Sequence, residues 1–169
     1  MEKITPQTPT AIVLMGVSGS GKSTIGKLLS SKTSFPFYDG DNFHPQKNIK
    51  KMAAGQALND DDRQGWLQAI NTFCVEKLDN NNSCIIACSA LKESYRDLLR
   101  NGIEEQVTFV YLMGDFELIK KRLADRDSHF MPVSLLKSQF DTLQPPKDAL
   151  VVDIGHTPEE ITTKIIESI

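Results

Sequence analysis

Short apolar runs alternate with longer amphipathic stretches along the chain. Five runs have the length and composition of buried strands, and they cover residues 11–15, 35–38, 84–88, 107–112 and 149–154. Runs that are apolar on both faces are typical of a parallel sheet with helices on each side. The pattern therefore predicts a three-layer αβα fold of the α/β class, in which helices cover both faces of a five-stranded parallel sheet.

Helical periodicity fills the stretches between these runs. Apolar residues recur three or four positions apart in seven segments, which we expect to be helices at residues 22–33, 46–53, 63–79, 92–101, 115–125, 133–142 and 158–168. The chain has 169 residues, of which 40% are hydrophobic, and this size and balance suit one core. We therefore expect residues 1–169 to form a single domain.

A glycine-rich segment separates the first predicted strand from the first predicted helix. It reads Gly16-Val17-Ser18-Gly19-Ser20-Gly21-Lys22-Ser23, followed by Thr24, and matches the phosphate-binding pattern G-x-x-x-x-G-K-[ST]. Its glycines permit positive φ and close backbone approach, so successive N–H groups can point at an anion at the start of the helix. The segment predicts a P-loop NTPase that binds ATP and Mg²⁺, with Lys22 on the β- and γ-phosphates and the Ser23 hydroxyl on the metal.

Two carboxylates, Asp39 and Asp41, follow the second predicted strand. Ligands of open α/β sheets bind beyond the carboxyl ends of the strands, so both side chains are candidates for the site. In Mg²⁺-dependent phosphoryl transfer, one carboxylate can hold the metal while the other accepts the proton of the acceptor hydroxyl. We assign Asp39 to the metal and Asp41 to the base, and the reverse assignment stays open.

The third predicted strand is followed by Ser89-Ala90-Leu91-Lys92, without the carboxylate of a typical Walker B motif. This departure leaves the second metal-organising role to the acidic pair after the second strand. It favours a kinase of the small-metabolite or nucleoside-monophosphate type over a GTPase.

Basic side chains outside the loop are candidates for binding anionic ligand groups. The forked guanidinium of Arg63 suits a substrate carboxylate, although the acidic residues before it can equally be helix caps. Arg122 and Arg126 lie four residues apart on one predicted helix face, and a second helical segment follows. We expect a helical lid at about residues 122–135, which would bring these arginines, including a catalytic Arg126, over the phosphoryl group and exclude water. His44 is a candidate donor in the acceptor pocket.

Charge and cysteine content exclude several other classes. The net charge of −3 argues against a general nucleic-acid or acidic-membrane binder. No apolar stretch approaches the roughly 18 residues that span a bilayer, and the start lacks the apolar core of a signal peptide. The three cysteines lack metal-ligand spacing and suit a reducing compartment. We therefore expect a cytoplasmic protein with no nucleic-acid or membrane partner.

Several motifs together resemble the thermoresistant gluconokinase family of P-loop kinases. Beyond the phosphate loop, these motifs are Asp39-Gly40-Asp41 with His44-Pro45, Asn48-Ile49, Leu58-Asn59-Asp60-Asp61-Asp62-Arg63, Ser89-Ala90-Leu91-Lys92, Tyr95-Arg96-Asp97 and Gln139-Phe140-Asp141-Thr142-Leu143-Gln144. The resemblance covers about residues 11–154. The phosphate loop identifies only a superfamily, whereas the motifs in the middle of the chain are far more specific.

The resemblance implies an activity, a fold and an assembly. It implies transfer of the γ-phosphoryl group of ATP to the 6-hydroxyl of D-gluconate, which gives 6-phospho-D-gluconate. It also implies a shikimate-kinase-like fold and a homodimer.

The resemblance further implies roles for individual residues. Asp41 is similar to the base of the family, and Arg122 and Arg126 are similar to its lid arginines, which handle phosphate and adenine. The acceptor site, with its helices at about residues 41–80, would be formed by Asp41, His44, Arg63, Arg96 and the backbone of Ser89 and Ala90.

Two alternatives remain at this point. A related small-metabolite kinase such as shikimate kinase has glycines where this chain has Ser89-Ala90-Leu91. A nucleotide-dependent binding protein without turnover would need neither an acceptor base such as Asp41 nor lid arginines.

Overall fold

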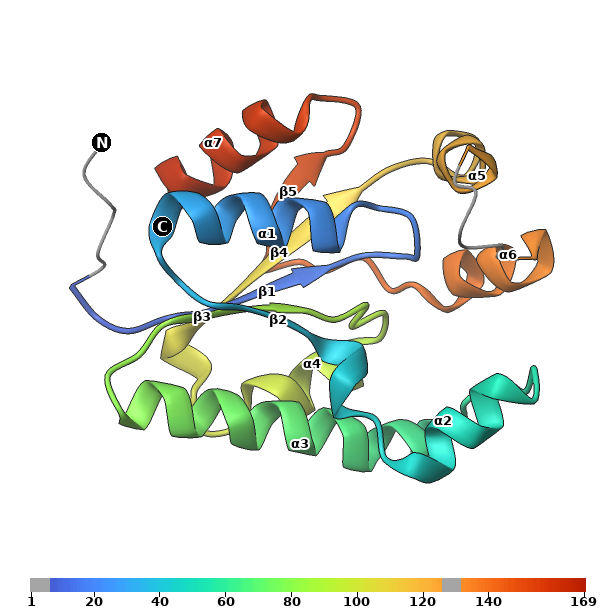
Figure 1. Ribbon diagram of the computed structural model, residues 1–169, viewed down its shortest axis with the longest axis horizontal. Coiled ribbons are helices and arrows are strands. Elements are labelled where there is room, and N and C mark those ends of the chain that lie inside the picture. Colours follow the sequence, from blue (N-terminus) through green and yellow to red (C-terminus); the bar gives the residue numbers. More distant parts are fainter. Residues whose placement is uncertain (1–6, 126–131) are drawn as a thin grey trace.

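A five-stranded parallel sheet lies at the centre of the protein in a computed structural model, which describes residues 7–125 and 132–169 (Figure 1). The strands are β1 (Ala11–Met15), β2 (Phe37–Asp39), β3 (Cys84–Ala87), β4 (Val107–Met113) and β5 (Leu150–Asp153). They lie in the order β2-β3-β1-β4-β5, and every neighbouring pair is parallel. The α/β fold and all five strands predicted from the apolar runs are confirmed.

Strand β1 is buried on both faces. Ala11 is in register with Cys84 of β3 on one side and with Val107 of β4 on the other. Its alternate residues belong to two different cores, because Ile12 and Leu14 pack on one face of the sheet and Val13 on the opposite face. This explains why the sequence of β1 is apolar without alternation.

Two layers of helices cover the sheet (Figure 1). Helices α1 (Lys22–Thr33) and α7 (Pro158–Ser168) cover one face, and α3 (Asp60–Asp79) and α4 (Glu93–Arg100) cover the other. Three further helices lie toward the carboxyl ends of the strands: α2 (Gln46–Ala53), α5 (Phe116–Ala124) and α6 (Val133–Thr142). Short 3₁₀ turns occur at η1 (Gly40–Phe43) and η2 (Glu104–Gln106). None of the helices among the described residues is long and apolar enough to cross a membrane.

Two element boundaries differ from the sequence prediction for identifiable reasons. Strand β2 begins at Phe37 rather than at residue 35, after Pro36, which has no backbone N–H for a ladder. Helix α3 begins three residues before Arg63, because Asn59 and Asp62 form a reciprocal capping box. The Asp62 N–H donates to Asn59 Oδ1 at 2.8 Å, and the Asn59 N–H donates to Asp62 Oδ2 at 3.0 Å.

Two glycines provide a matched test of the packing between η1 and β3. A Cβ atom at Gly40 would lie 2.3 Å from the Ala87 carbonyl oxygen, whereas a Cβ atom at Gly65 on α3 would meet nothing within 4 Å. We expect Gly40→Ala to lower the free energy of unfolding by about 1–3 kcal/mol. Gly65→Ala should raise it by about 0.5–1 kcal/mol, because alanine favours the helix. Urea unfolding of both variants checks this, and equal effects of the two changes would contradict the close contact at Gly40.

Candidate active site

The carboxyl edge of the sheet brings together loops that are distant in the sequence. The Gly16 N–H donates to the Ser89 carbonyl at 3.2 Å, which joins the loop after β1 to the loop after β3. The close approach of Gly40 to Ala87 joins the loop after β2 to the same place. The three segments that carry most of the predicted site residues therefore lie side by side.

The phosphate loop has the backbone conformation that its glycines predict. Gly16, Gly19 and Gly21 have φ angles of 146°, 83° and 97°. Helix α1 then begins at Lys22 with no side-chain cap, so its first N–H groups face the loop without a competing side-chain acceptor. The Lys22 ammonium donates to the carbonyls of Gly16 and Val17 at 2.9 and 3.0 Å. These features form a concave, electropositive site that suits an anion.

Gln139 on α6 contacts the phosphate loop directly. The Ser18 N–H donates to Gln139 Oε1 at 2.7 Å, and Gln139 Nε2 donates to the Ser18 hydroxyl at 3.2 Å. Sequence reasoning included Gln139 only as part of a resembling segment and assigned it no role. A long-range contact of this kind has no signal in local periodicity.

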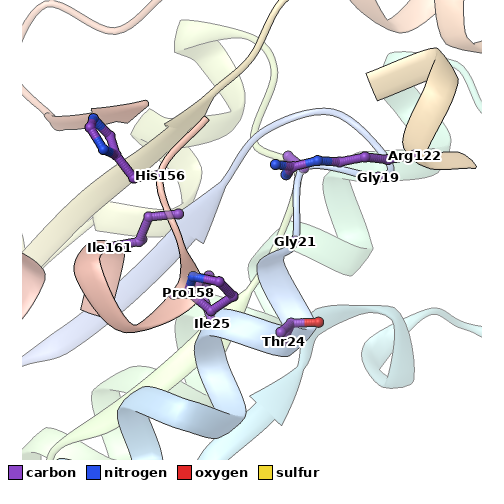
Figure 2. A pocket seen from close by; sticks show the side chains of 9 residues that line it. Gly19, Gly21, Thr24, Ile25, Arg122, His156, Pro158 and Ile161 are labelled. Atoms are coloured by element: carbon purple, nitrogen blue, oxygen red, sulfur yellow. The ribbon is translucent and has the colours of Figure 1, made fainter. Parts of the chain in front are cut away.

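A pocket lies beside the phosphate loop, between the starts of α1 and α7 (Figure 2). Its volume is about 140 Å³, the order of size of a cavity that holds one aromatic ring. Its lining comes from Gly19, Ser20, Gly21, Thr24, Ile25, Arg122, His156, Pro158 and Ile161. The Arg122 guanidinium donates to the Ile154 carbonyl at 2.6 Å, which holds this side chain at the loop side of the pocket. Arg122 therefore lies next to the phosphate loop, whereas Arg126 falls outside the described residues.

The two predicted carboxylates lie at the end of β2. The Asp41 N–H donates to Asp39 Oδ1 at 3.0 Å, which orders the turn between them. The Asp41 side chain is 83% exposed, and its Oδ1 lies 4.0 Å from His44 Nε2. The surrounding protein and the neighbouring Asp39 carboxylate raise the pKa of Asp41 above its usual range, while His44 and Lys22 oppose this rise. Asp41 is thus an accessible carboxylate whose environment makes it a stronger proton acceptor than a free aspartate.

His44 lies behind Asp41 in a stacked aromatic pair. Its ring lies on the Trp66 indole with centroids 4.1 Å apart, and its side chain is only 4% exposed. The Trp66 Nε1–H donates to the Gly40 carbonyl at 2.7 Å and so fixes the stack relative to the turn. Burial lowers the pKa of His44, with Asp41 opposing and Arg63 adding to the shift, so the imidazole is neutral at neutral pH.

Arg63 lies on the same side of the site as His44. One guanidinium nitrogen donates to the Tyr95 hydroxyl at 3.0 Å, and that hydroxyl donates to Asp60 Oδ1 at 2.5 Å. Lys92 also donates to Asp60 at 3.1 Å. Arg63 is half-buried, and its hydrogen bond to Tyr95 uses one of the five N–H donors of the guanidinium. The arrangement can present an ordered cation to an acidic substrate.

Arg96 lies deeper in the fold than the sequence analysis expects. Its side chain is fully buried, and its guanidinium donates to the Ala90 carbonyl at 2.7 Å, to Glu93 Oε2 at 2.9 Å and to the Gln144 carbonyl at 2.8 Å. These contacts count against direct binding of the acceptor by Arg96, because the donors already have partners inside the protein. Arg96 instead supports the loop in which Ala90 has a φ of 46°.

The two predicted metal ligands both lie at the carboxyl edge of the sheet. The Ser23 hydroxyl is exposed on the first turn of α1, and Asp39 ends β2. Among the described residues, no group of three or more His, Cys, Asp or Glu side chains could hold a metal. One hydroxyl and one carboxylate suit Mg²⁺, which usually keeps several waters and takes its other ligands from substrate phosphates.

Comparison with known proteins identifies relatives over nearly the whole chain. A family model described as shikimate kinase matches residues 18–169. The thermoresistant gluconokinase of Escherichia coli (strain K12) is 48% identical over 161 residues, which are 93% of this chain and 91% of the relative. The gluconokinase of Arabidopsis thaliana is 40% identical over 176 residues, which are 96% of this chain and 93% of the relative.

A solved structure agrees with these sequence relatives. The crystal structure of a gluconokinase from Sinorhizobium meliloti 1021 is similar to this chain, with a TM-score of 0.85 and 41% sequence identity. The similarity covers 96% of this chain and 92% of that chain. Fold and sequence therefore indicate the same family.

The different surroundings of Arg96 and Arg63 lead to a stability prediction. We expect Arg96→Met to lower the free energy of unfolding by about 2–3 kcal/mol, because it leaves the buried Ala90 carbonyl and the Gln144 carbonyl without their donor and leaves Glu93 paired only with Arg100 at 3.4 Å. Arg63→Met removes a half-buried cation that donates a hydrogen bond to the Tyr95 hydroxyl, and it should cost about 1 kcal/mol. Urea unfolding of the two variants measures the difference. If Arg96→Met lost no more stability than Arg63→Met, the supporting role of Arg96 would be wrong.

Proposed function

The chain belongs to the gluconokinase family, and we propose from this premise that it transfers the γ-phosphoryl group of ATP to the 6-hydroxyl of D-gluconate. The products are ADP and 6-phospho-D-gluconate. The observation that carries the proposal is 48% identity to a gluconokinase over 93% of the chain, in a structure whose phosphate loop adjoins Arg122 and whose loop lysine, Lys22, acts on the exposed carboxylate of Asp41. The chain is a kinase, so the remaining questions concern its acceptor and the roles of its residues.

The phosphate loop and its neighbours would bind the nucleotide. Amides from Gly19 to Thr24, where the loop enters α1, suit the β- and γ-phosphates, because the N–H groups of Gly16 and Ser18 already donate within the protein. Lys22 would move from the loop carbonyls to the phosphate oxygens. The pocket at Arg122 suits the adenine base of ATP. It adjoins the phosphate loop, and its volume of about 140 Å³ can hold one aromatic ring. Arg126 would complete the charge over the transferring group.

Magnesium is part of the proposal. Ser23 and Asp39 would hold it together with phosphate oxygens and water. When bound, the metal would neutralise charge that develops on the phosphate oxygens.

The acceptor would bind between η1, α3 and the loop after β3. Arg63 suits the gluconate carboxylate and the Ser89–Ala90 backbone suits its hydroxyls, whereas His44, whose side chain is only 4% exposed, would contact Asp41 rather than the acceptor. Asp41 would accept the proton of the 6-hydroxyl as the oxygen attacks phosphorus, since its carboxylate is exposed and its pKa is raised. Arg96 would act on this site only through the loop that it supports.

Shikimate kinase remains the second candidate function, because the matching family model has that description. The loop after β3 is the point of difference. Shikimate kinases have glycines there, whereas this chain has Ala90 in a left-handed conformation that glycine adopts more readily. The Ala90 side chain, present here despite the cost of its left-handed backbone, favours an acceptor other than shikimate.

Assembly and location are further parts of the proposal. A homodimer accompanies the family resemblance, and a cytoplasmic location is proposed because the number and spacing of the cysteines suit a reducing compartment. The three cysteines are buried and free. The single domain, with a lid at about residues 122–135 and acceptor helices at about residues 41–80, stays a prediction.

An acceptor panel tests the proposed function. We expect ADP release with ATP, Mg²⁺ and D-gluconate, and little release with shikimate, a nucleoside monophosphate or no acceptor. Phosphorus NMR of the product should show a phosphate monoester on the terminal carbon. Turnover with shikimate above that with gluconate would replace the proposal, and nucleotide binding without any turnover would favour a binding protein.

Asp41→Asn separates catalysis from stability. We expect kcat to fall by about 10²-fold or more if proton removal limits the step, with the Kd for ATP unchanged. The raised pKa of Asp41 means that the folded protein disfavours its ionised form, so stability falls as pH rises through its range. The variant should therefore be at least as stable as the parent at pH 7, and any advantage should shrink as pH falls toward about 4, the ordinary pKa of an aspartate, and be absent below it.

The control for this change is Asp79→Asn, which removes an exposed carboxylate at the far end of α3. It should leave kcat unchanged. A kcat for Asp41→Asn equal to that of this control would remove Asp41 from the role of base.

A further inference from the structure

Asn48 on α2 is a buried polar side chain without an evident packing role. It is 0% exposed, and its Nδ2 donates to the backbone carbonyl of Asp62 at 2.8 Å. Its Oδ1 is buried and has no hydrogen-bond partner among the described residues. A buried, unpaired amide oxygen costs free energy that leucine, with similar volume, would avoid. The amide therefore needs an explanation other than packing.

The orientation of the Asn48 amide follows from its partner. A backbone carbonyl only accepts hydrogen bonds, so the atom that faces Asp62 must be the nitrogen. The same nitrogen lies 3.3 Å from His44 Nδ1. Its second hydrogen is available to this contact, and Nδ1 must then be the acceptor.

The neutral His44 ring therefore carries its proton on Nε2. Stacking on Trp66 at an interplanar angle of 18° holds the ring plane, and Nε2 lies 4.0 Å from Asp41 Oδ1. A shift of about 1 Å would bring these two atoms within hydrogen-bond distance. The proton is thus on the nitrogen that faces the carboxylate.

We propose that Asn48 is a positioning residue that sets the tautomer of His44, so that Nε2–H is directed at Asp41. This inference rests on the proposed role of Asp41 as the base. The Nε2–H would engage one carboxylate oxygen and leave the other for the acceptor hydroxyl. With the proton on Nδ1 instead, the Nε2 lone pair would face the carboxylate and repel it.

The contact with Asp62 links this arrangement to α3. The Asp62 side chain caps the helix through Asn59 and accepts a hydrogen bond from Lys51 on α2 at 2.5 Å. Asn48 bonds the backbone of the same residue. Helix α2 and the start of α3 are therefore joined at the place where the tautomer is determined.

Nitrogen NMR of the ¹⁵N-labelled parent protein tests the tautomer without any variant of Asn48. Long-range ¹H–¹⁵N spectra distinguish protonated from unprotonated imidazole nitrogens, and His44→Gln identifies the His44 signals by their loss. We expect an unprotonated Nδ1 and a protonated Nε2 at neutral pH. A proton on Nδ1 would overturn the proposal.

Asn48→Leu tests the consequence. We expect loss of the single tautomer and a fall in kcat of about 10-fold or more, with the Kd for ATP unchanged. The matched control is Asn71→Leu, since Asn71 on α3 also donates through Nδ2 to two acceptors, the carbonyls of Leu99 and Asn101. That control should lose stability without a change in kcat or in the His44 spectrum.

The outcomes distinguish the role of Asn48 from the role of Asp41. Parent-like kcat or a retained Nε2–H tautomer in folded Asn48→Leu would overturn the role of Asn48. If Asn48→Leu does not fold, the parent spectrum still decides the tautomer. Full activity of Asp41→Asn would instead overturn the base assignment, whichever tautomer His44 has.

Discussion

Burial of β1 between β3 and β4 is the constraint on which the rest of the structure depends. Because all five strands are parallel and this strand is covered on both faces, the chain must leave the sheet at the carboxyl edge through a tight turn. The glycines of the phosphate loop make that turn, and a Cβ atom at Gly16 would lie 2.9 Å from the Leu112 carbonyl oxygen. The same packing that stabilises the core thus presents the loop amides at the start of α1.

The acceptor side is ordered mainly by buried polar contacts rather than by the sheet. Arg96 holds the carbonyls of Ala90 and Gln144, and Trp66 holds the carbonyl of Gly40. These bonds place short loops with an accuracy that apolar packing alone does not give, because each donor has a defined direction. The left-handed Ala90 and the unpaired Asn48 oxygen are costs that the surrounding structure offsets.

The protein shifts the pKa values of the neighbouring Asp41 and His44 in opposite directions. The pKa of Asp41 is raised by the protein around it and by Asp39, while the pKa of His44 is lowered by burial. The histidine is therefore neutral at neutral pH, and its effect on Asp41 depends on which nitrogen carries the proton. Environment, rather than residue type alone, gives each group its chemistry.

Sequence by itself determined the strands, their parallel arrangement, the positive φ of the loop glycines and the family, because apolar periodicity and short motifs are local properties. It did not distinguish Arg63 from Arg96, which have the same side chain in similar helical contexts but different burial. It also gave no role to Gln139, which meets Ser18 across 121 residues, or to Asn48, whose meaning depends on His44 and Asp62 together. Only the tertiary structure decided these, since burial and hydrogen-bond partners arise when distant segments pack against one another.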